Sequence, residues 1–318
     1  MALASVNSSS QLPRRWRLFD RAERIAAALW PQKMHQYSGY LLLVPAILLV
    51  FVLVIGLIYI GGYSLHELDL TTYRLKEAFS LTNYTTAVTS STYQSVVLRS
   101  IGASMLVTVF TLMLAFPYAY LMVRARRAAT RKFLLISLFL PFFIGQIVRA
   151  YGWLIILGKE GLINTIFTAL GLPAMNLIYN YPAVILGLVQ YMLPFAVLLL
   201  APAITAIGRD VELASESLGA NWVRTFIHVV LPMAKPGLVG SAVVVFTLTL
   251  TDFAMPEILG GGTTDFIANA IYDGFFQLSN SGLGAALAMI LVTLGTAFVV
   301  ILFFIAGTGT LGFSGREQ

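Results

Sequence analysis

The sequence predicts an all-α membrane protein with six transmembrane helices, both termini on the inner side, and a cytoplasmic loop of two short helices between helices 4 and 5. Three observations predict this fold class. Hydrophobic residues make up 58% of the 318 residues, charged residues make up 11%, and the mean hydropathy is +0.84. Soluble domains are about half apolar and about a quarter charged. The apolar excess forms six long runs, and Lys and Arg are concentrated in every second segment between them.

The six apolar runs have the length of helices that cross a bilayer. A spanning helix needs about 20 residues to cross about 30 Å of hydrocarbon. It must also satisfy its own backbone hydrogen bonds, because lipid offers none. A β-barrel would instead show short segments of alternating polarity. The predicted helices therefore cover residues 39–63, 96–123, 133–157, 183–207, 237–259 and 283–306.

The distribution of Lys and Arg predicts the orientation. With the N-terminus inside, fifteen of the 20 basic residues fall on the inner side and four on the outer side. Cytoplasmic loops carry such an excess of Lys and Arg. We therefore expect both termini inside, and outer loops at residues 66–95, 158–182 and 260–282, the first of them with a short helix.

The ends of the chain and its composition complete the outline. Residues 1–38 form a basic N-terminal tail, and residues 39–318 form one membrane domain with the loop 208–235 inside it. The segment 14–30 mixes basic and large apolar residues, which indicates either a helix on the inner membrane surface or a disordered basic tail. The chain contains no cysteine, which excludes disulfides and thiolate metal sites.

The loop 208–235 has the pattern of two short amphipathic helices. Its first part is acidic, with Glu212 and Glu216, and ends at Gly219, a residue suited to stop a helix. Its second part places Trp222 and Phe226 on one face at helical spacing, before Pro232 breaks the pattern. We expect a compact projection with a small-residue joint that another protein surface can approach closely.

The loop also resembles the signature of bacterial ABC importer permeases. That signature is Glu-Ala-Ala, three residues, Gly, nine residues, Ile, one residue and Leu-Pro, and here nine residues separate Gly219 from Val229. The Glu-Ala-Ala positions hold Leu213, Ala214 and Ser215, with the acids displaced to neighbouring positions. The resemblance implies a coupling-helix loop that docks on an ATPase. The docking residues it implies are Glu212, Ala214, Glu216, Gly219, Ala220, Phe226, Leu231 and Pro232.

The resemblance also implies the partners of this chain in a bacterial inner membrane. They are a cytoplasmic ABC ATPase dimer, a second and different permease subunit, and a binding protein outside that delivers the solute. The chain has no Gly-x-x-x-x-Gly-Lys-Ser/Thr loop, so we expect it to bind no cofactor, with ATP used by the partner ATPase. Nucleic acid is not an expected partner, and the chain is not expected to be an enzyme.

Other stretches resemble the spermidine/putrescine branch of these permeases. They are residues 148–153, 191–195 and 251–253, together with Pro256 and Asn269. This resemblance implies a polyamine or a similar organic cation as the solute. Permeases for opines, aminophosphonates and ferric iron have similar sequences, so these solutes are the alternatives within the same class.

Arg149 and Asp252 lie well inside predicted spans, where charged residues are candidates for function. Arg149 lies 16 residues past Phe133 and Asp252 lies 16 residues past Pro236, or roughly 24 Å from the inner ends of the spans at 1.5 Å per residue. They are expected either to form an ion pair that fixes helix packing, or to leave Asp252 free to bind a cationic amine. The candidate substrate path comprises Asp252, Phe253, Glu257, Arg149, Tyr151, Gln190 and Tyr191.

Two other function classes fit the sequence less well. A membrane enzyme would need a nucleophile with a base or a His-Glu-x-x-His pair within the bilayer, and neither pattern is present, so no metal site is expected. A self-sufficient secondary transporter often shows inverted repeats and polar broken helices at the midplane, and the sequence shows neither pattern.

Overall fold

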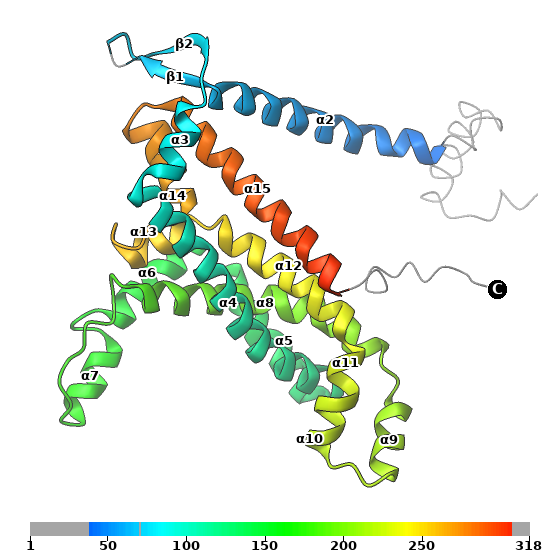
Figure 1. The fold of residues 1–318 in the computed structure, drawn as a ribbon. Coiled ribbons are helices and arrows are strands. Elements are labelled where there is room, and N and C mark those ends of the chain that lie inside the picture. The colour runs from blue at the N-terminus through cyan, green and yellow to red at the C-terminus, as the bar shows by residue number, and fades with distance from the viewer. Residues whose placement is uncertain (1–37, 70, 307–318) are drawn as a thin grey trace, which may run out of the picture. The chain divides into compact units, whose positions relative to one another are not determined.

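The computed structural model describes residues 38–69 and 71–306, and its order of elements is almost entirely helical (Figure 1). The possible helix of the N-terminal tail lies outside these residues. In chain order, the first half contains α2 (Ser38–Ser64), β1 (His66–Asp69), β2 (Arg74–Phe79), α3 (Thr82–Thr89), α4 (Ser91–Arg124), α5 (Ala128–Phe139), the 3-10 helix η2 (Leu140–Phe143), α6 (Gln146–Leu157) and α7 (Leu162–Ala169).

The second half begins with α8 (Tyr181–Ala206), which is followed by a series of short helices. These are α9 (Arg209–Ser217), α10 (Trp222–Thr225), the π-helix η3 (Phe226–Val230) and α11 (Leu231–Met233). The chain then continues through α12 (Lys235–Leu250), α13 (Ala254–Gly260), α14 (Ile267–Tyr272), the π-helix η4 (Asp273–Gln277) and α15 (Ser281–Ala306).

Among the described residues, four helices are long and apolar enough to cross a membrane: Leu43–Ser64, Ser91–Arg124, Tyr181–Ala206 and Ser281–Ile305. The number becomes six if each of two bent helix pairs is one span. The first pair is Ala128–Phe143 with Gln146–Ala169, bent by 99°, and the second is Trp222–Met233 with Lys235–Leu250, bent by 70°. The predicted span 133–157 is therefore not a straight helix.

The predicted spans 133–157 and 237–259 are each interrupted for a local reason, and the interruption of the second is separate from the 70° bend before Lys235. In the third predicted span, Pro141 lies in η2 and Gly145 adopts an extended conformation, with ψ 148°, before α6 begins. In the fifth, the expected helix 237–259 is interrupted between Leu250 and Ala254. The ring of Pro256 would meet the carbonyl of the residue four positions earlier, Asp252, in a continuous helix. The chain restarts instead, with Pro256 in the first turn of α13, where proline is tolerated.

The core lies where α4 packs against α8 and α12 (Figure 1). Fully buried alanines such as Ala103, Ala119 and Ala196 allow the backbones to approach closely, as is usual for helices packed in a membrane. Ser100 and Ser104 are also buried on α4, and each hydroxyl donates to the carbonyl four residues earlier, at 2.7 and 2.8 Å. The core therefore contains polar side chains that donate within their own helix, and the Ser100 hydroxyl also accepts from the amide of Ile267, at the start of α14, at 2.8 Å.

The segment 66–95 holds the expected short helix, α3, and also a small sheet that the sequence analysis did not predict. β1 and β2 pair as an antiparallel hairpin. The buried side chain of Asn83 donates to the carbonyls of Ser64 and His66, at 3.0 and 2.9 Å. Asn83 thereby fixes the start of the hairpin against α3.

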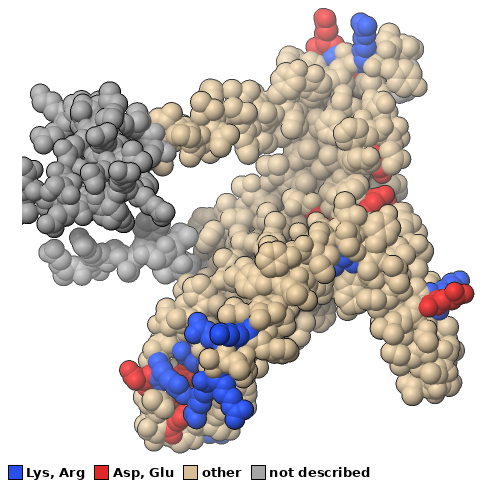
Figure 2. Space-filling model, turned by 180° about the vertical axis from the view of Figure 1, so that it is seen from behind, with Lys and Arg blue, Asp and Glu red and all other residues tan. Residues whose placement is uncertain are grey.

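Basic side chains are concentrated at the end of the molecule that carries α9 and α10 (Figure 2). The positive-inside rule predicts that this end faces the cytoplasm. The exposed basic residues of α5, of the segment before it and of the loop 208–235 are Arg126, Arg127, Arg131, Lys132, Arg209, Arg224 and Lys235.

Candidate functional site

The loop 208–235 forms the two helical parts that its sequence predicts. The first, α9, ends at Ser217, and Gly219 follows with φ +85°, a left-handed conformation that disfavours residues with a Cβ. The amide of Gly219 donates to the carbonyl of Glu216 at 2.9 Å, and the amide of Ala220 donates to that of Ser215 at 3.1 Å. Gly219 is thus a helix stop that gives the chain its reversal.

The second helical part begins with a cap and then widens. The side chain of Asn221 accepts a hydrogen bond from the amide of Arg224 at 2.9 Å, which starts α10. The chain then makes one π-helical turn, in which the amide of Leu231 donates to the carbonyl of Phe226. Pro232 has no amide hydrogen to continue an α-helical ladder, which favours this local change in winding. The widened turn keeps the rings of Trp222 and Phe226 stacked, with centroids 5.5 Å apart.

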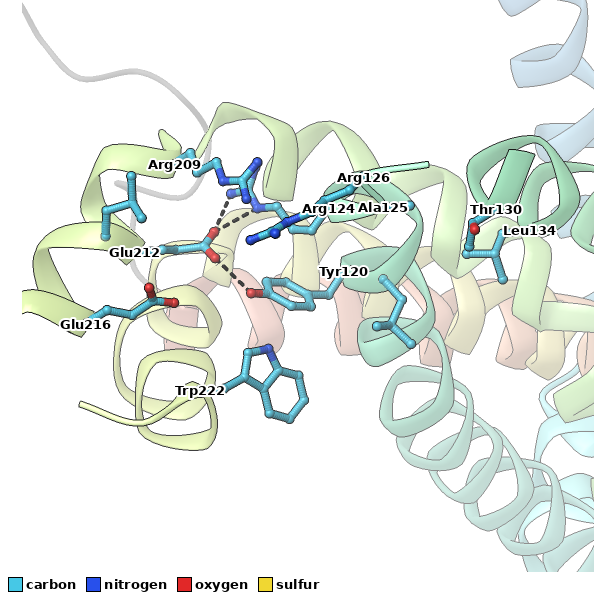
Figure 3. A pocket seen from close by; sticks show the side chains of 12 residues that line it. Tyr120, Arg124, Ala125, Arg126, Thr130, Leu134, Arg209, Glu212, Glu216 and Trp222 are labelled. Atoms are coloured by element: carbon cyan, nitrogen blue, oxygen red, sulfur yellow. Dashed lines mark hydrogen bonds and ion pairs between the residues drawn. The ribbon is translucent and has the colours of Figure 1, made fainter. Parts of the chain in front are cut away.

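Glu212 of α9 is buried and is held by two residues of α4 (Figure 3). Arg124, the last residue of α4, donates from Nε to Glu212 Oε1 at 2.8 Å, and its Nη2 lies 2.6 Å from the same oxygen. Tyr120 donates its hydroxyl to Glu212 Oε2 at 2.8 Å. Both carboxylate oxygens are therefore occupied. We call Tyr120, Arg124 and Glu212 the inner clamp.

The inner clamp corrects one expectation for the loop. Glu212 is predicted to meet a partner protein, but the residue is only 7% exposed and bonds within the chain. Its carboxylate lies beside Tyr120 and Arg124 at the end of α4, whereas Glu216, one helical turn further along α9, is exposed. Large apolar side chains are also exposed on the loop, and we call them the tip patch: Leu213, Leu218, Trp222 and Val223.

Asp252 lies in the break between α12 and α13 and is almost fully buried. Its Oδ1 accepts from the amide of Met255 at 2.9 Å, which caps the start of α13. Its Oδ2 accepts from the side-chain amide of Gln146 at the start of α6. Sequence reasoning missed Gln146, although a polar residue at the start of an apolar helix is a signal for such a contact. Asp252 thus joins the two broken helices.

Arg149 does not pair with Asp252, so the ion pair that the sequence analysis left open is not formed. Its Nη2 donates to the carbonyls of Pro141 and Ile144, the latter at 3.0 Å. These carbonyls are available because the helix is broken before α6. The guanidinium lies 5.1 Å from the centroid of the Tyr191 ring. Its Nε and Nη1 are buried and have no hydrogen-bond partner among the described residues.

The remaining candidate path residues separate into two groups. Gln190 accepts from the indole of Trp153 at 3.4 Å, and Tyr191 lies against Arg149, so these residues join the cluster on α6 and α8. Tyr151 is 54% exposed and therefore points away from that cluster, because it lies on the other face of α6.

Asn269 connects the break to the segment after α13. Its side-chain amide donates to Glu257 Oε2 at 2.9 Å and to the carbonyl of Phe253 at 3.2 Å, and its oxygen accepts from the amide of Phe266 at 3.1 Å. The ring of Phe253 lies 5.0 Å from that of Tyr272. Tyr272 was not predicted as a site residue, and only the fold brings it to the break.

Asn269→Ala is expected to destabilise the folded protein. Each buried polar group left without a partner costs about 1–3 kcal/mol, and the variant leaves at least the Phe266 amide in that state. A thermal melt in detergent measures the effect. Asn176→Ala, at an exposed position of the segment before α8, is the matched control and should melt like the parent. Equal melting temperatures for the two variants would contradict the role given to Asn269.

The fold is that of a membrane chain of an ABC transporter. A chain of the bacterial alginate ABC transporter, solved in complex with an alginate pentasaccharide-bound periplasmic protein, matches with a TM-score of 0.74 at 17% identity. The match covers 89% of this chain and 98% of that one. At this identity the similarity establishes the fold and nothing further.

Sequence similarity identifies the family. Residues 108–307 match the model of the binding-protein-dependent transport system inner membrane component, and the chain belongs to that family. The inner membrane ABC transporter permease protein YdcU of Escherichia coli K12 is 31% identical over 247 residues, covering 73% of this chain and 75% of the relative. The spermidine/putrescine permease PotB of the same strain is 29% identical over 256 residues, covering 80% and 92%.

The family assignment confirms the main conclusions from the sequence. The chain is a permease subunit of an ABC importer and lies in the inner membrane. It is not an enzyme, because the ATPase of these importers is a separate subunit.

Proposed function

We propose that this permease subunit forms part of the import path for a polyamine, spermidine or putrescine, or for a similar small organic cation. The single observation that carries the proposal is the pair of carboxylates at the broken fifth helix, Asp252 and Glu257. Each accepts hydrogen bonds from neutral amides. The described residues contain two ion pairs, Glu67–Lys76 and Glu212–Arg124, and neither includes Asp252 or Glu257.

A carboxylate within a membrane favours a cationic partner, because neutral dipoles offset only part of its desolvation cost. An ammonium group of the solute would supply that charge. Aromatic rings stand beside these carboxylates: Phe253, Tyr272 and Phe276 follow one another with centroids 5.0 and 4.9 Å apart. Faces of this kind attract alkylammonium groups by cation–π interaction. The similarity to PotB, a permease protein of a spermidine/putrescine transport system, supports the same solute class.

Further carboxylates lie after α13. Burial, and then the charges of Glu257 and Asp273, raise the pKa of Asp265 above its ordinary value. Burial and the charge of Glu257 likewise raise the pKa of Asp273. Such mutual effects arise only between groups that lie near one another. A local excess of negative charge would increase the concentration of a cation at this end of the path.

A second candidate solute follows from Arg149. Its unpartnered Nε and Nη1 are donors suited to a carboxylate or phosphonate. A solute with both an ammonium and an acidic group, such as an opine or an aminophosphonate, would use Asp252 and Arg149 together. Polyamines remain the first proposal, because Arg149 is already engaged with two carbonyls and the Tyr191 ring.

The loop 208–235 is the proposed contact with the ATPase, on the cytoplasmic face. It combines an exposed apolar tip patch with a glycine reversal, and basic residues surround it. A binding protein delivers the solute at the opposite face, and a second, different permease subunit completes the path. The shape and apolar tip of the loop support docking into a groove, and with Glu212 buried the exposed acids of the loop are Asp210 and Glu216.

Reconstitution tests the proposed solute. The permease pair, its ATPase and its binding protein are placed in liposomes, and uptake of labelled spermidine and putrescine is measured with ATP on the ATPase side. We expect saturable, ATP-dependent uptake that an opine or an aminophosphonate does not inhibit. Inhibition by these zwitterions, without uptake of polyamine, would favour the second candidate and refute the first.

A further inference from the structure

We propose that the inner clamp makes the loop 208–235 and helix α4 move as one body, and that Glu212 is the positioning residue of this connection. The inference rests on the proposed docking of the loop on the ATPase. It assigns to Glu212 a role inside the permease, in which the residue passes displacement of the loop to the helix core without touching the ATPase.

The bonding of the clamp is complete and specific. The Nε and Nη2 groups of Arg124 both reach Glu212 Oε1, and the Tyr120 hydroxyl occupies Oε2. A lysine at position 124 would be a point charge and would not reproduce this planar fork. The ion pair is largely shielded, with side-chain exposures of 18% for Arg124 and 10% for Glu212. Shielded pairs are screened little by salt, and breaking one leaves a buried charge without compensation.

Arg124 also holds the end of the helix that precedes the loop. Its Nη2 donates to the carbonyl of Ile207 at 2.8 Å and lies 3.4 Å from that of Ile204. These carbonyls belong to the last turn of α8 and its cap, where carbonyls run out of α-helical partners, and that of Ile204 also accepts from the amide of Ile207 at 3.2 Å. One guanidinium therefore ties the end of α4, the end of α8 and the first helix of the loop.

The second half of the loop is held on the same stretch of α4 by aromatic contacts. The ring of Phe226 packs edge-on against Tyr120 and against Phe116, each with centroids 5.2 Å apart. Trp222 lies 6.1 Å from Tyr120. Both helical parts of the loop thus contact one face of α4, and α4 packs along α8 and α12 in the core. Displacement of the loop can therefore be transmitted to α4, and from α4 to α8 and α12, through these packed side chains.

The residues around the clamp leave a pocket of about 480 Å³ at this junction (Figure 3). It lies between α4, the start of α5 and the loop, and Trp222, Glu216 and Arg126 help to line it. The loop is therefore not packed against α4 over its whole surface. Because the contact between the loop and α4 is only partial, the hydrogen-bonded clamp is the attachment that holds α9 to α4, and its loss would release α9 from α4.

The first experiment measures coupling in the complete reconstituted importer. Glu212→Gln keeps the size of the side chain and removes its charge. We expect the ATPase to co-purify as before and to hydrolyse ATP, while solute imported per ATP falls about tenfold, within the range of roughly 5- to 150-fold usual for coupling between sites. Glu67→Gln, which removes a carboxylate from the exposed pair with Lys76, is the control and should leave this ratio unchanged.

The second experiment measures the distance between α4 and the loop directly, first in the protein with an intact clamp and then in the Glu212→Gln variant. The chain has no cysteine, so Leu121→Cys and Asp210→Cys place spin labels only at the end of α4 and at the start of α9. We expect one narrow distance distribution that is the same without nucleotide and with ATP bound. In the Glu212→Gln background the distribution should broaden. A distance that shifts when ATP binds to the parent protein would overturn the proposal.

The outcomes separate this inference from the proposed function. Loss of ATPase co-purification in the parent would refute docking of the loop, and absence of polyamine uptake would refute the proposed solute. Normal import per ATP in Glu212→Gln, with a narrow and unchanged label distance, would refute the clamp alone.

Discussion

Gly219→Glu is expected to abolish solute uptake and to release the ATPase from the purified permease. The glycine has φ +85°, where a residue with a Cβ costs roughly 1–2 kcal/mol. Apart from its chain neighbours, no described residue has an atom within 4 Å of the Cβ that a substitution would add, so this part of the permease has room for a side chain. In the proposed complex that space faces the ATPase, where glutamate adds both bulk and charge. Uptake in liposomes and co-purification of the ATPase measure the two effects.

Gly171→Glu is the matched control for this prediction. Gly171 follows α7 and has φ +75°, and an added Cβ would likewise meet no atom within 4 Å among the residues that the structure describes, its chain neighbours aside. The variant therefore carries the same backbone strain in a segment predicted to lie on the opposite face, and it should retain uptake and the ATPase. If both variants lose uptake equally, or if Gly219→Glu transports normally with its ATPase bound, the proposed contact is wrong.

Asp252→Asn is expected to lower uptake of a polyamine at low concentration about tenfold or more, because a charge-assisted hydrogen bond contributes about 1.5–3 kcal/mol. The asparagine oxygen can still accept from the Met255 amide, so the cap of α13 is retained. The variant should therefore assemble with its partners and melt near the parent temperature. Initial uptake rates over a range of polyamine concentrations provide the measurement.

Two comparison variants separate charge from structure at this position. Asp252→Ala loses the cap and the contact with Gln146, so it should melt at a lower temperature than Asp252→Asn. Glu160→Gln removes an exposed carboxylate in the segment before α7 and should transport normally. Unchanged uptake by Asp252→Asn at low polyamine concentration would leave Asp252 with the role of a helix cap only.

The sequence predicted those elements that are specified by residues close together in the chain. The helix stop at Gly219 and the two parts of the loop follow from glycine, proline and helical spacing, and the structure has them in the predicted places. Two of the predicted spans are interrupted where a break depends on one or two residues. Pro256 blocks a continuous helix through Asp252, whereas Pro45 lies inside α2 without a break.

The hydrogen-bond partners of the charged side chains could not be predicted, because each partner comes from a segment far away in the sequence. Glu212 and Arg124 are separated by 88 positions, and Gln146 and Asp252 by 106. From depth alone, Arg149 was as good a partner for Asp252 as Gln146. The broken helix before α6 brings the carbonyls of Pro141 and Ile144 within reach of Arg149, and this local geometry decided the pairing.

By itself, the sequence determined that this chain is a helical membrane permease with a projecting loop, because apolar run length, basic residues and turn residues act locally along the chain. Only the tertiary structure decided that Glu212 faces inward, that Asp252 bonds to Gln146 and that Arg149 bonds to backbone. The physical reason is that a buried charge takes whichever polar groups the folded helices bring within hydrogen-bond distance, and these groups come from remote parts of the chain.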